Sequence, residues 1–420
     1  MRKEGSHMKL RIGGAALAAA LLLAGAALTF ADGPKAYVGL FKDNAVGVID
    51  TATNRLIRTI PIPAGPHGVV VTPDGSTVFA SSDGDSVVSV IDTATDSVTA
   101  SIQVGKSPHG LAITPDGKTV LVAVFGTSSV AFIDVASRTV LGQAPAAQPH
   151  NIAVSPDGAT AYVAEQKKGA FALDVLDIPT MSKKGTVPLD KMPRAIGVSP
   201  DGAKLYFTLA GADAVQVLDT ATNRVVKQIP VGAAPHHPLF SPDGKFALVV
   251  SQGPGTLSRI DTASDSVQKI ATVGKLPHWI ALTGDGRAYV SNEESNDVSV
   301  VDLSTMKTTA TVPVGNAPRK MVIQPAMGVS AGAMKAGAVT AGISGFAFPD
   351  SVTITAGQSV LWTNADAVPH TVSADNGSWD SGEIASGATF LKRFDAAGVF
   401  SYHCSIHPSM TGTIVVKARG

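Results

Sequence analysis

The sequence predicts an all-β protein with two folded parts, a long array of repeated four-stranded units and a small β-sandwich at the C-terminal end. Three observations support this fold class. A short motif that begins with Pro, most often Pro-His, recurs every 41 to 44 residues along most of the 420-residue chain. Within each interval, Asp-Gly turns separate short apolar runs. The long amphipathic segments that a helical repeat of this length needs are missing from the sequence.

The composition narrows the function classes. The 33 Lys+Arg residues are balanced by 33 Asp+Glu, so no basic excess is available to neutralise phosphates, and we expect no nucleic-acid partner. A single cysteine excludes an intrachain disulfide, so the presence of this residue needs another chemical explanation. No Gly-x-Ser-x-Gly elbow, phosphate loop or dinucleotide fingerprint is present, and no hydrolase is suggested.

The first residues have the pattern of a tag followed by an export signal. Residues 1–7 precede Met8 and include Gly5-Ser6-His7, which is typical of a cloning scar. Residues 8–31 carry Lys9 and Arg11, then the uncharged run Ile12–Leu28, then a small-residue cleavage site at Ala31. A run of this length is short for a membrane span, although an uncleaved N-terminal anchor is an alternative. We expect a periplasmic or secreted protein without a stable membrane span in the mature chain.

The repeated units occupy residues 36–325. Six to seven residues after each motif comes a turn such as Pro73-Asp74-Gly75, and an apolar residue followed by Asp, such as Ile91-Asp92, forms a third anchor. Each unit is interpreted as four short strands, which in the second unit are Val69–Thr72, Thr77–Ser81, Val87–Ile91 and Val98–Val104. Four strands in a period of about 42 residues are typical of a β-propeller blade.

The ends of the array predict how the ring of blades closes. The chain enters at Ala36 on the second strand of a blade and leaves on a first strand, so strand 319–325 is expected to complete the first blade and close seven blades. The segments Ala161-Tyr162-Val163-Ala164 and Ala288-Tyr289-Val290-Ser291-Asn292 are close to the name-giving motif of the YVTN-type propellers. Residues 36–325 therefore resemble that family, which implies a seven-bladed β-propeller.

Histidines gather at one point of the repeat, the residue after the motif's Pro, which we call the ring position. Seven ring positions are expected at one mouth of the central channel. The residues on or beside them are His67, His109, His150, Arg194, His236, His237, His278 and Arg319. Two interpretations stay open. The histidines are copies of one ancestral repeat residue that bond to loop carbonyls, or they form a second metal or anion site, because neutral imidazoles ligate copper or zinc and Arg binds anions.

The C-terminal part carries a metal-ligand pattern. Residues 326–341 are rich in Ala, Gly, Ser and Met and are predicted as a linker, and residues 342–420 alternate as strands of a small Greek-key sandwich that begins at Gly342–Phe348. One thiolate, two imidazoles and a thioether make up the type 1 blue copper set, and they are supplied by His370, Cys404, His407 and Met410. The two residues on either side of His407 allow one short loop to surround the metal. The sequence predicts one type 1 copper and leaves a second metal open.

This domain resembles the cupredoxins, most closely the amicyanin and plastocyanin type with a short ligand loop. The resemblance implies one-electron transfer, with His370, Cys404, His407 and Met410 as the matching ligands. Because Cys404 is alone, a binuclear two-cysteine centre is excluded. His403 is adjacent to the copper cysteine, and in copper nitrite reductases such a histidine binds a second copper, whereas amicyanin-type proteins have a similar Tyr-His-Cys without one. Its side chain on a strand points to the face opposite that of Cys404.

We therefore expect an exported type 1 copper protein that carries single electrons, with the propeller as a docking or binding scaffold. The expected partner is a redox protein such as a c-type cytochrome or a periplasmic oxidoreductase. A copper-dependent oxidoreductase with a second site at the ring position is an alternative, because the domain order resembles that of nitrous oxide reductase. The ring arginines and the missing two-cysteine centre depart from that enzyme. A copper-handling protein is the third hypothesis.

Overall fold

The structure is a computed structural model that describes residues 34–325, 339–356, 358–384, 386, 389–394 and 397–418. The expected tag (1–7), the expected signal peptide (8–31) and residues 326–338 of the expected linker lie outside the described residues. Within the described ranges the chain is built from β-strands, and the one helical turn there is η1 (Phe125–Thr127). The predicted all-β fold class is confirmed.

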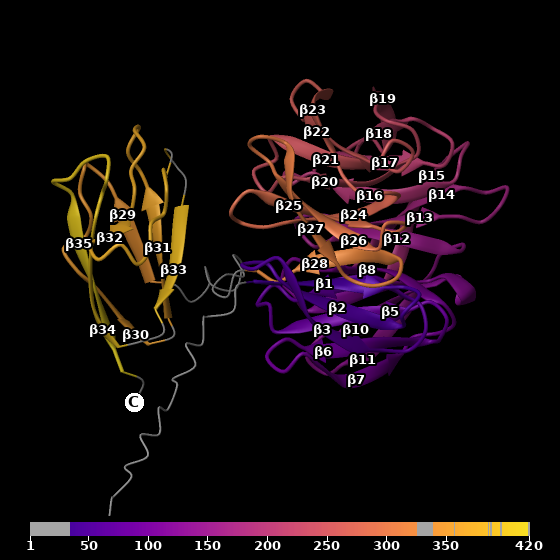
Figure 1. The fold of residues 1–420 in the computed structure, drawn as a ribbon, viewed down its shortest axis with the longest axis horizontal. Helices are drawn as coiled ribbons and strands as arrows, with labels where there is room; N and C mark the ends of the chain where they lie inside the picture. The colour runs from indigo at the N-terminus through magenta and orange to yellow at the C-terminus, as the bar shows by residue number, and fades with distance from the viewer. Residues whose placement is uncertain are drawn as a thin grey trace, which may run out of the picture. The chain divides into compact units, whose positions relative to one another are not determined.

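Residues 35–323 form seven four-stranded antiparallel sheets, the blades of the propeller (Figure 1). The innermost strands are β4 (Pro66–Val71), β8 (Pro108–Ile113), β12 (Pro149–Val154), β16 (Pro193–Val198), β20 (Pro235–Phe240), β24 (Pro277–Leu282) and β28 (Pro318–Ile323). The second strands are β1 (Lys35–Leu40), β5 (Thr77–Ser82), β9 (Thr119–Val124), β13 (Thr160–Glu165), β17 (Lys204–Leu209), β21 (Phe246–Ser251) and β25 (Arg287–Asn292).

The remaining two strands of each blade lie further from the axis. The third strands are β2 (Ala45–Asp50), β6 (Val87–Asp92), β10 (Ser129–Asp134), β14 (Ala172–Asp177), β18 (Ala214–Asp219), β22 (Thr256–Asp261) and β26 (Asp297–Asp302). The outermost strands are β3 (Arg55–Pro61), β7 (Ser97–Gln103), β11 (Thr139–Pro145), β15 (Ser182–Pro188), β19 (Arg224–Pro230), β23 (Ser266–Thr272) and β27 (Lys307–Pro313).

The first blade is completed by the last strand of the array. β28 pairs antiparallel with β1, with Val38 opposite Met321 and Ala36 opposite Ile323, and the two strands lie side by side in Figure 1. Each innermost strand also contacts the innermost strand of the next blade, and β28 contacts β4. The circle of blades is therefore closed by strands from opposite ends of the array, and the inner edge of β1 is paired.

The hydrophobic cores lie between blades rather than within them. One cluster joins Tyr37, Val46 and Val48 of the first blade to Val78 and Ile91 of the second. The middle strands are covered on both faces and are buried along almost their whole length, while the outermost strands are largely exposed. Each fully buried Val or Ile side chain stabilises the array by about 1.5–3 kcal/mol.

A β-bulge at the start of the innermost strands sets the ring position. In the second blade Pro66 lies opposite Ser82 and Val69 opposite Ala80, so His67 and Gly68 share one partner residue. The same shift recurs in the other blades, as between Pro108 and Leu111. A bulge re-aims the side chain that it carries, and here that side chain is the ring residue.

Residues 339–417 form a sandwich of two sheets. One contains β29 (Val339–Ile343), β31 (Gln358–Asn364) and β33 (Thr389–Phe394), and the other β30 (Val352–Thr355), β35 (Thr411–Lys417), β34 (Gly398–His403) and β32 (Ser373–Ala374). Their core includes Trp362, Tyr402 and Ile414. The strand expected at Gly342–Phe348 instead spans Val339–Ile343, because Gly345 and Phe346 adopt positive φ and turn the chain away from β31.

Candidate metal centre

The four predicted copper ligands come from two loops at one end of the sandwich. His370 lies in the loop between β31 and β32, and Cys404, His407 and Met410 lie in the hairpin between β34 and β35. The hairpin is short because its ends are tied together. The Cys404 N–H donates to the Met410 carbonyl at 3.0 Å, and the Met410 N–H donates to the His407 carbonyl at 2.9 Å.

Three of these side chains meet closely. Cys404 Sγ lies 3.9 Å from His370 Nδ1 and 3.7 Å from His407 Nδ1, and the two imidazole nitrogens are 3.1 Å apart. Ligands bound to one metal at about 2.0–2.3 Å lie roughly 3–4 Å from each other, so the triangle has the size of a metal site. The Met410 side chain is buried in the same core cluster as Cys404.

The environment favours the thiolate form of Cys404. Burial alone would raise the pKa of this thiol, but the Thr371 N–H, which lies 3.2 Å from the sulfur, and the imidazoles of His370 and His407 lower its pKa to about 6. A thiolate is the form in which cysteine binds metal. The thiolate form of Cys404 therefore favours the binding of a soft or borderline metal cation.

Asp366 orients one of the ligands. Its carboxylate lies 3.0 Å from Nε2 of His370, which is completely buried, and it also accepts the N–H groups of Gly345 and Phe346. These hydrogen bonds lower the pKa of Asp366. Because a carboxylate only accepts, the His370 proton is held on Nε2 and the Nδ1 lone pair faces Cys404. Sequence reasoning missed Asp366, although it lies only four residues before His370.

His403 lies away from this triangle. Its Nδ1 is 2.7 Å from the Asp375 carboxylate, and the side chain is about one-third exposed. The group of residues able to hold a metal contains His370, Cys404 and His407 without it. The alternation along β34 thus separates His403 from the adjacent Cys404, as the strand geometry predicts.

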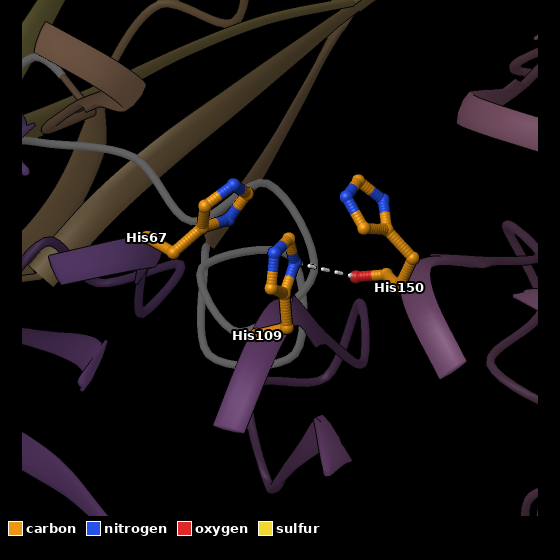
Figure 2. Close-up of side chains that lie close together, drawn as sticks. All are labelled: His67, His109 and His150. Carbon is orange, nitrogen blue, oxygen red and sulfur yellow. Dashed lines mark hydrogen bonds between the residues drawn. The ribbon is translucent and has the colours of Figure 1, made fainter. Parts of the chain in front are cut away.

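The structure also brings together five ring-position histidines of the propeller. Ring centroids are 3.5 Å apart for His67 and His109, 4.0 Å for His109 and His150, and 4.3 Å for His236 and His278. His67 and His278 are 5.8 Å apart and connect the two groups. Figure 2 shows the first three rings converging from three separate strands.

His237 is separated from these five. It stacks on Trp279 with ring centroids 3.4 Å apart, and its Nδ1 accepts the N–H of Ile280 at 3.2 Å. Lys320 completes this stack, with its ammonium 4.4 Å from the Trp279 ring centre. Sequence reasoning overlooked Lys320, which is 1% exposed and whose pKa is lowered by burial to about 7.

The two ring arginines have protein partners. Arg194 donates from Nη1 to the Gln252 side-chain oxygen at 2.7 Å. Arg319 forms an ion pair with Glu293 at 2.9 Å and lies over the Phe41 ring at 3.6 Å. Each of the two guanidinium groups thus already has a protein partner.

Comparison with known proteins identifies both domains. Residues 19–115 match the YNCE-like beta-propeller family, and residues 335–417 match the copper binding proteins of the plastocyanin/azurin family. The chain is 35% identical to a plastocyanin of Scenedesmus fuscus over 16% of its own length and 84% of the relative's. The chain belongs to the plastocyanin/azurin family through its C-terminal domain.

Two further comparisons agree with this division. Amicyanin-alpha of Methylorubrum extorquens is 37% identical over 16% of this chain, which spans 60% of that relative. A hydrazine synthase structure from Kuenenia stuttgartiensis has a TM-score of 0.60 at 21% identity, covering 64% of this chain and 93% of that one. This likeness shows the fold alone.

The cofactor of this plastocyanin/azurin-type domain is copper. The family is one of copper-binding proteins, and the donor set of the described site, one buried thiol with a lowered pKa and two imidazoles beside a buried methionine, fits that metal. A structural zinc site would use more thiolates, and a catalytic zinc site would leave an open position. Among the described residues, no helix has the length and apolar character needed to cross a bilayer.

Proposed function

We propose that this protein is an exported electron carrier in which His370, Cys404, His407 and Met410 bind one type 1 copper. The observation that carries the proposal is the buried Cys404–His370–His407 triangle in a plastocyanin/azurin-type sandwich. A ligand frame fixed by two sheets and a tied hairpin changes little between Cu(I) and Cu(II). Little reorganisation means fast transfer of a single electron.

The path of the electron follows from the exposure of the ligands. His370 is fully buried, whereas His407 is only partly buried and lies next to the exposed Ile406. The exposed ring of Phe346 packs edge-on against both imidazoles, with its centroid 5.1 Å from that of His407. We assign entry and exit of the electron to the His407 edge, with Phe346 and Ile406 as the apolar contact for a partner.

The partner in this proposal is another redox protein, such as a c-type cytochrome or a periplasmic oxidoreductase. Export is supported by the composition of residues 8–31, which have the charge and apolar pattern of a signal peptide. The propeller serves as a docking scaffold. It presents large exposed apolar side chains on its outermost strands, among them Leu141, Val226 and Ile270.

The test is copper loading of the full chain followed by visible spectroscopy and metal analysis. We expect an intense blue absorption from thiolate-to-Cu(II) charge transfer, and Cys404→Ser should abolish it while the propeller stays folded. His403→Gln is the matched control, because His403 faces Asp375 and should leave the band intact. An undiminished blue band in Cys404→Ser would refute the ligand assignment.

The same samples test the carrier role. The copper-loaded protein should oxidise a reduced c-type cytochrome in a stopped-flow mixing experiment, with one electron accepted per type 1 copper, and Cys404→Ser should accept none at this site. A blue protein that exchanges no electron with any small redox protein would instead contradict the carrier role while leaving the copper site standing.

A further inference from the structure

Three histidines from neighbouring blades come close enough to share one ion. His67, His109 and His150 are the ring residues of β4, β8 and β12, and one ring nitrogen from each lies within 4.8 Å of the others (Figure 2). His67 and His109 are 3% and 9% exposed, and His150 is half-buried. Burying three imidazoles side by side has a cost, because each brings polar nitrogens out of water that then need partners.

The Nδ1 atoms of two of these rings have hydrogen-bond partners, and in His109 the partner fixes which nitrogen carries the lone pair. His109 Nδ1 lies 3.2 Å from the His150 carbonyl oxygen, and His150 Nδ1 lies 3.1 Å from that of Arg194. His150 Nδ1 also lies 3.1 Å from the Asn151 side-chain nitrogen, which only donates. In His109 the partner is a carbonyl oxygen, which only accepts, so its Nδ1 carries the proton and its Nε2 carries the lone pair. This is the arrangement by which metal-ligating histidines are usually oriented.

His67 adds a buried nitrogen without a partner, a feature that it shares with His236 and His278. Its Nδ1 is buried and has no hydrogen-bond partner among the described residues. An unsatisfied buried polar atom costs about 1–3 kcal/mol. An ion bound between the three rings would give such a nitrogen a partner.

The charges around the three rings select the kind of ion. Burial, followed by the neighbouring imidazoles and cations, lowers the pKa of His67 and His109, so these rings stay neutral and able to ligate. The ligand group contains no carboxylate, and the Arg319 guanidinium acts on His109 and His150, with Lys320 adding to this positive field when its amine is protonated. A positive field without anionic ligands disfavours a dication, whereas Cu(I) carries a single charge and is satisfied by few ligands, among which imidazole is suitable.

We propose that His67, His109 and His150 bind one Cu(I) ion inside the propeller, separate from the type 1 copper. The remaining contacting pair, His236 and His278, lies outside this group of three. The proposal does not depend on the electron-carrier function, since it rests on propeller residues alone.

The test uses the full chain with the cupredoxin site disabled by Cys404→Ser and His407→Gln. Cu(I) is added without oxygen in competition with bicinchoninate, a coloured Cu(I) chelator, and the retained copper is counted. We expect one Cu(I) per chain. Adding His67→Gln and His109→Gln should weaken its affinity by at least about 100-fold, since two of three ligands are lost. Circular dichroism and the thermal midpoint report whether this variant is folded.

His236→Gln in the same background is the matched control. It removes an equally buried ring-position imidazole that lies outside the group of three, so the Cu(I) should be retained. The proposal is overturned if the disabled background holds no Cu(I), or if the folded His67→Gln/His109→Gln variant keeps it. Loss of the ion in His236→Gln would also overturn the assignment to these three residues, as would retention of Zn²⁺ in place of Cu(I).

Discussion

Asp366 influences the copper centre through His370 and not by touching the metal. Its carboxylate oxygen lies 3.0 Å from Nε2 of the buried His370 imidazole and accepts the Nε2 proton. The carboxylate also accepts two backbone N–H groups. A negative charge on the far side of a ligand makes that imidazole a stronger donor. Stronger donation favours Cu(II) over Cu(I), so Asp366 should lower the reduction potential.

The substitution Asp366→Asn removes this charge, and its one side-chain oxygen can replace only one of the two carboxylate oxygens that accept from Gly345 and Phe346. We expect the reduction potential to rise by on the order of 50 mV, with the blue band retained. A redox titration followed at that band measures the change. Asp375→Asn is the control, because Asp375 pairs with His403 on the opposite face of β34. Equal potentials for wild type and Asp366→Asn would contradict the positioning role.

The contrast between ligands and supporting residues explains what the sequence could predict at this scale. Cys404, His407 and Met410 lie within seven residues and are of types with few other reasons to cluster, so spacing identified them. Asp366 and Lys320 are ordinary residue types, and only the fold places one against His370 and the other over Trp279. Lys320 occupies a repeat position held by Gly68 and Gly110 in other blades, and this substitution was the available signal.

Among the strands, β28 has a role that its sequence alone does not distinguish. It pairs with β1, the strand at the opposite end of the array in sequence, and contacts both β24 and β4. The repeat period predicted the strands because turn chemistry recurs in every blade, with Asp-Gly turns and apolar runs in fixed order. The start of β29 was predicted less well, since a linker rich in small residues has no sharp boundary signal.

Two truncated chains, one ending after β28 and one ending before it, should show whether this strand is needed to close the ring of blades. A chain of residues 34–325 should fold with a cooperative thermal transition. A chain of residues 34–317 should not, because Met321 is buried and its removal alone costs about 2–5 kcal/mol, a large share of the 5–15 kcal/mol typical of a domain. Calorimetry and circular dichroism measure both. If the two chains unfold alike, the ring is not closed by this strand.

Across the whole propeller, one local hydrogen-bond pattern is multiplied by the repeat. The Asp that ends each third strand accepts the N–H of a residue three positions on, as Asp92 does from Thr95 and Asp302 from Thr305. The Asp of each Asp-Gly turn accepts nearby N–H and hydroxyl groups, as Asp74 does from Ser76. Such bonds lower the pKa of carboxylates such as Asp74 and Asp92. The pKa falls to about 2 for Asp177, chiefly through the Lys184 ammonium, and for Asp302, chiefly through the Ser304 hydroxyl. The lowering of an aspartate pKa therefore recurs along the propeller, and together these shifts affect the acid stability of the whole domain.

The expected consequence is a steep loss of propeller stability in acid. Aspartate has a pKa near 3.9 in the unfolded chain, so the contribution of each lowered carboxylate is complete above about pH 4 and disappears as the pH falls towards its folded pKa, which is about 2 for Asp177 and Asp302. Because many sites take up protons together on unfolding, the fall should be steep. Calorimetry of the copper-free full chain measures it in the larger transition, which belongs to the larger domain. The double variant Asp177→Asn/Asp302→Asn keeps an acceptor oxygen in each turn but cannot titrate, so its midpoint should fall less between pH 4 and pH 2. Parallel curves for the two proteins would mean that these turn carboxylates are not the source of the acid sensitivity.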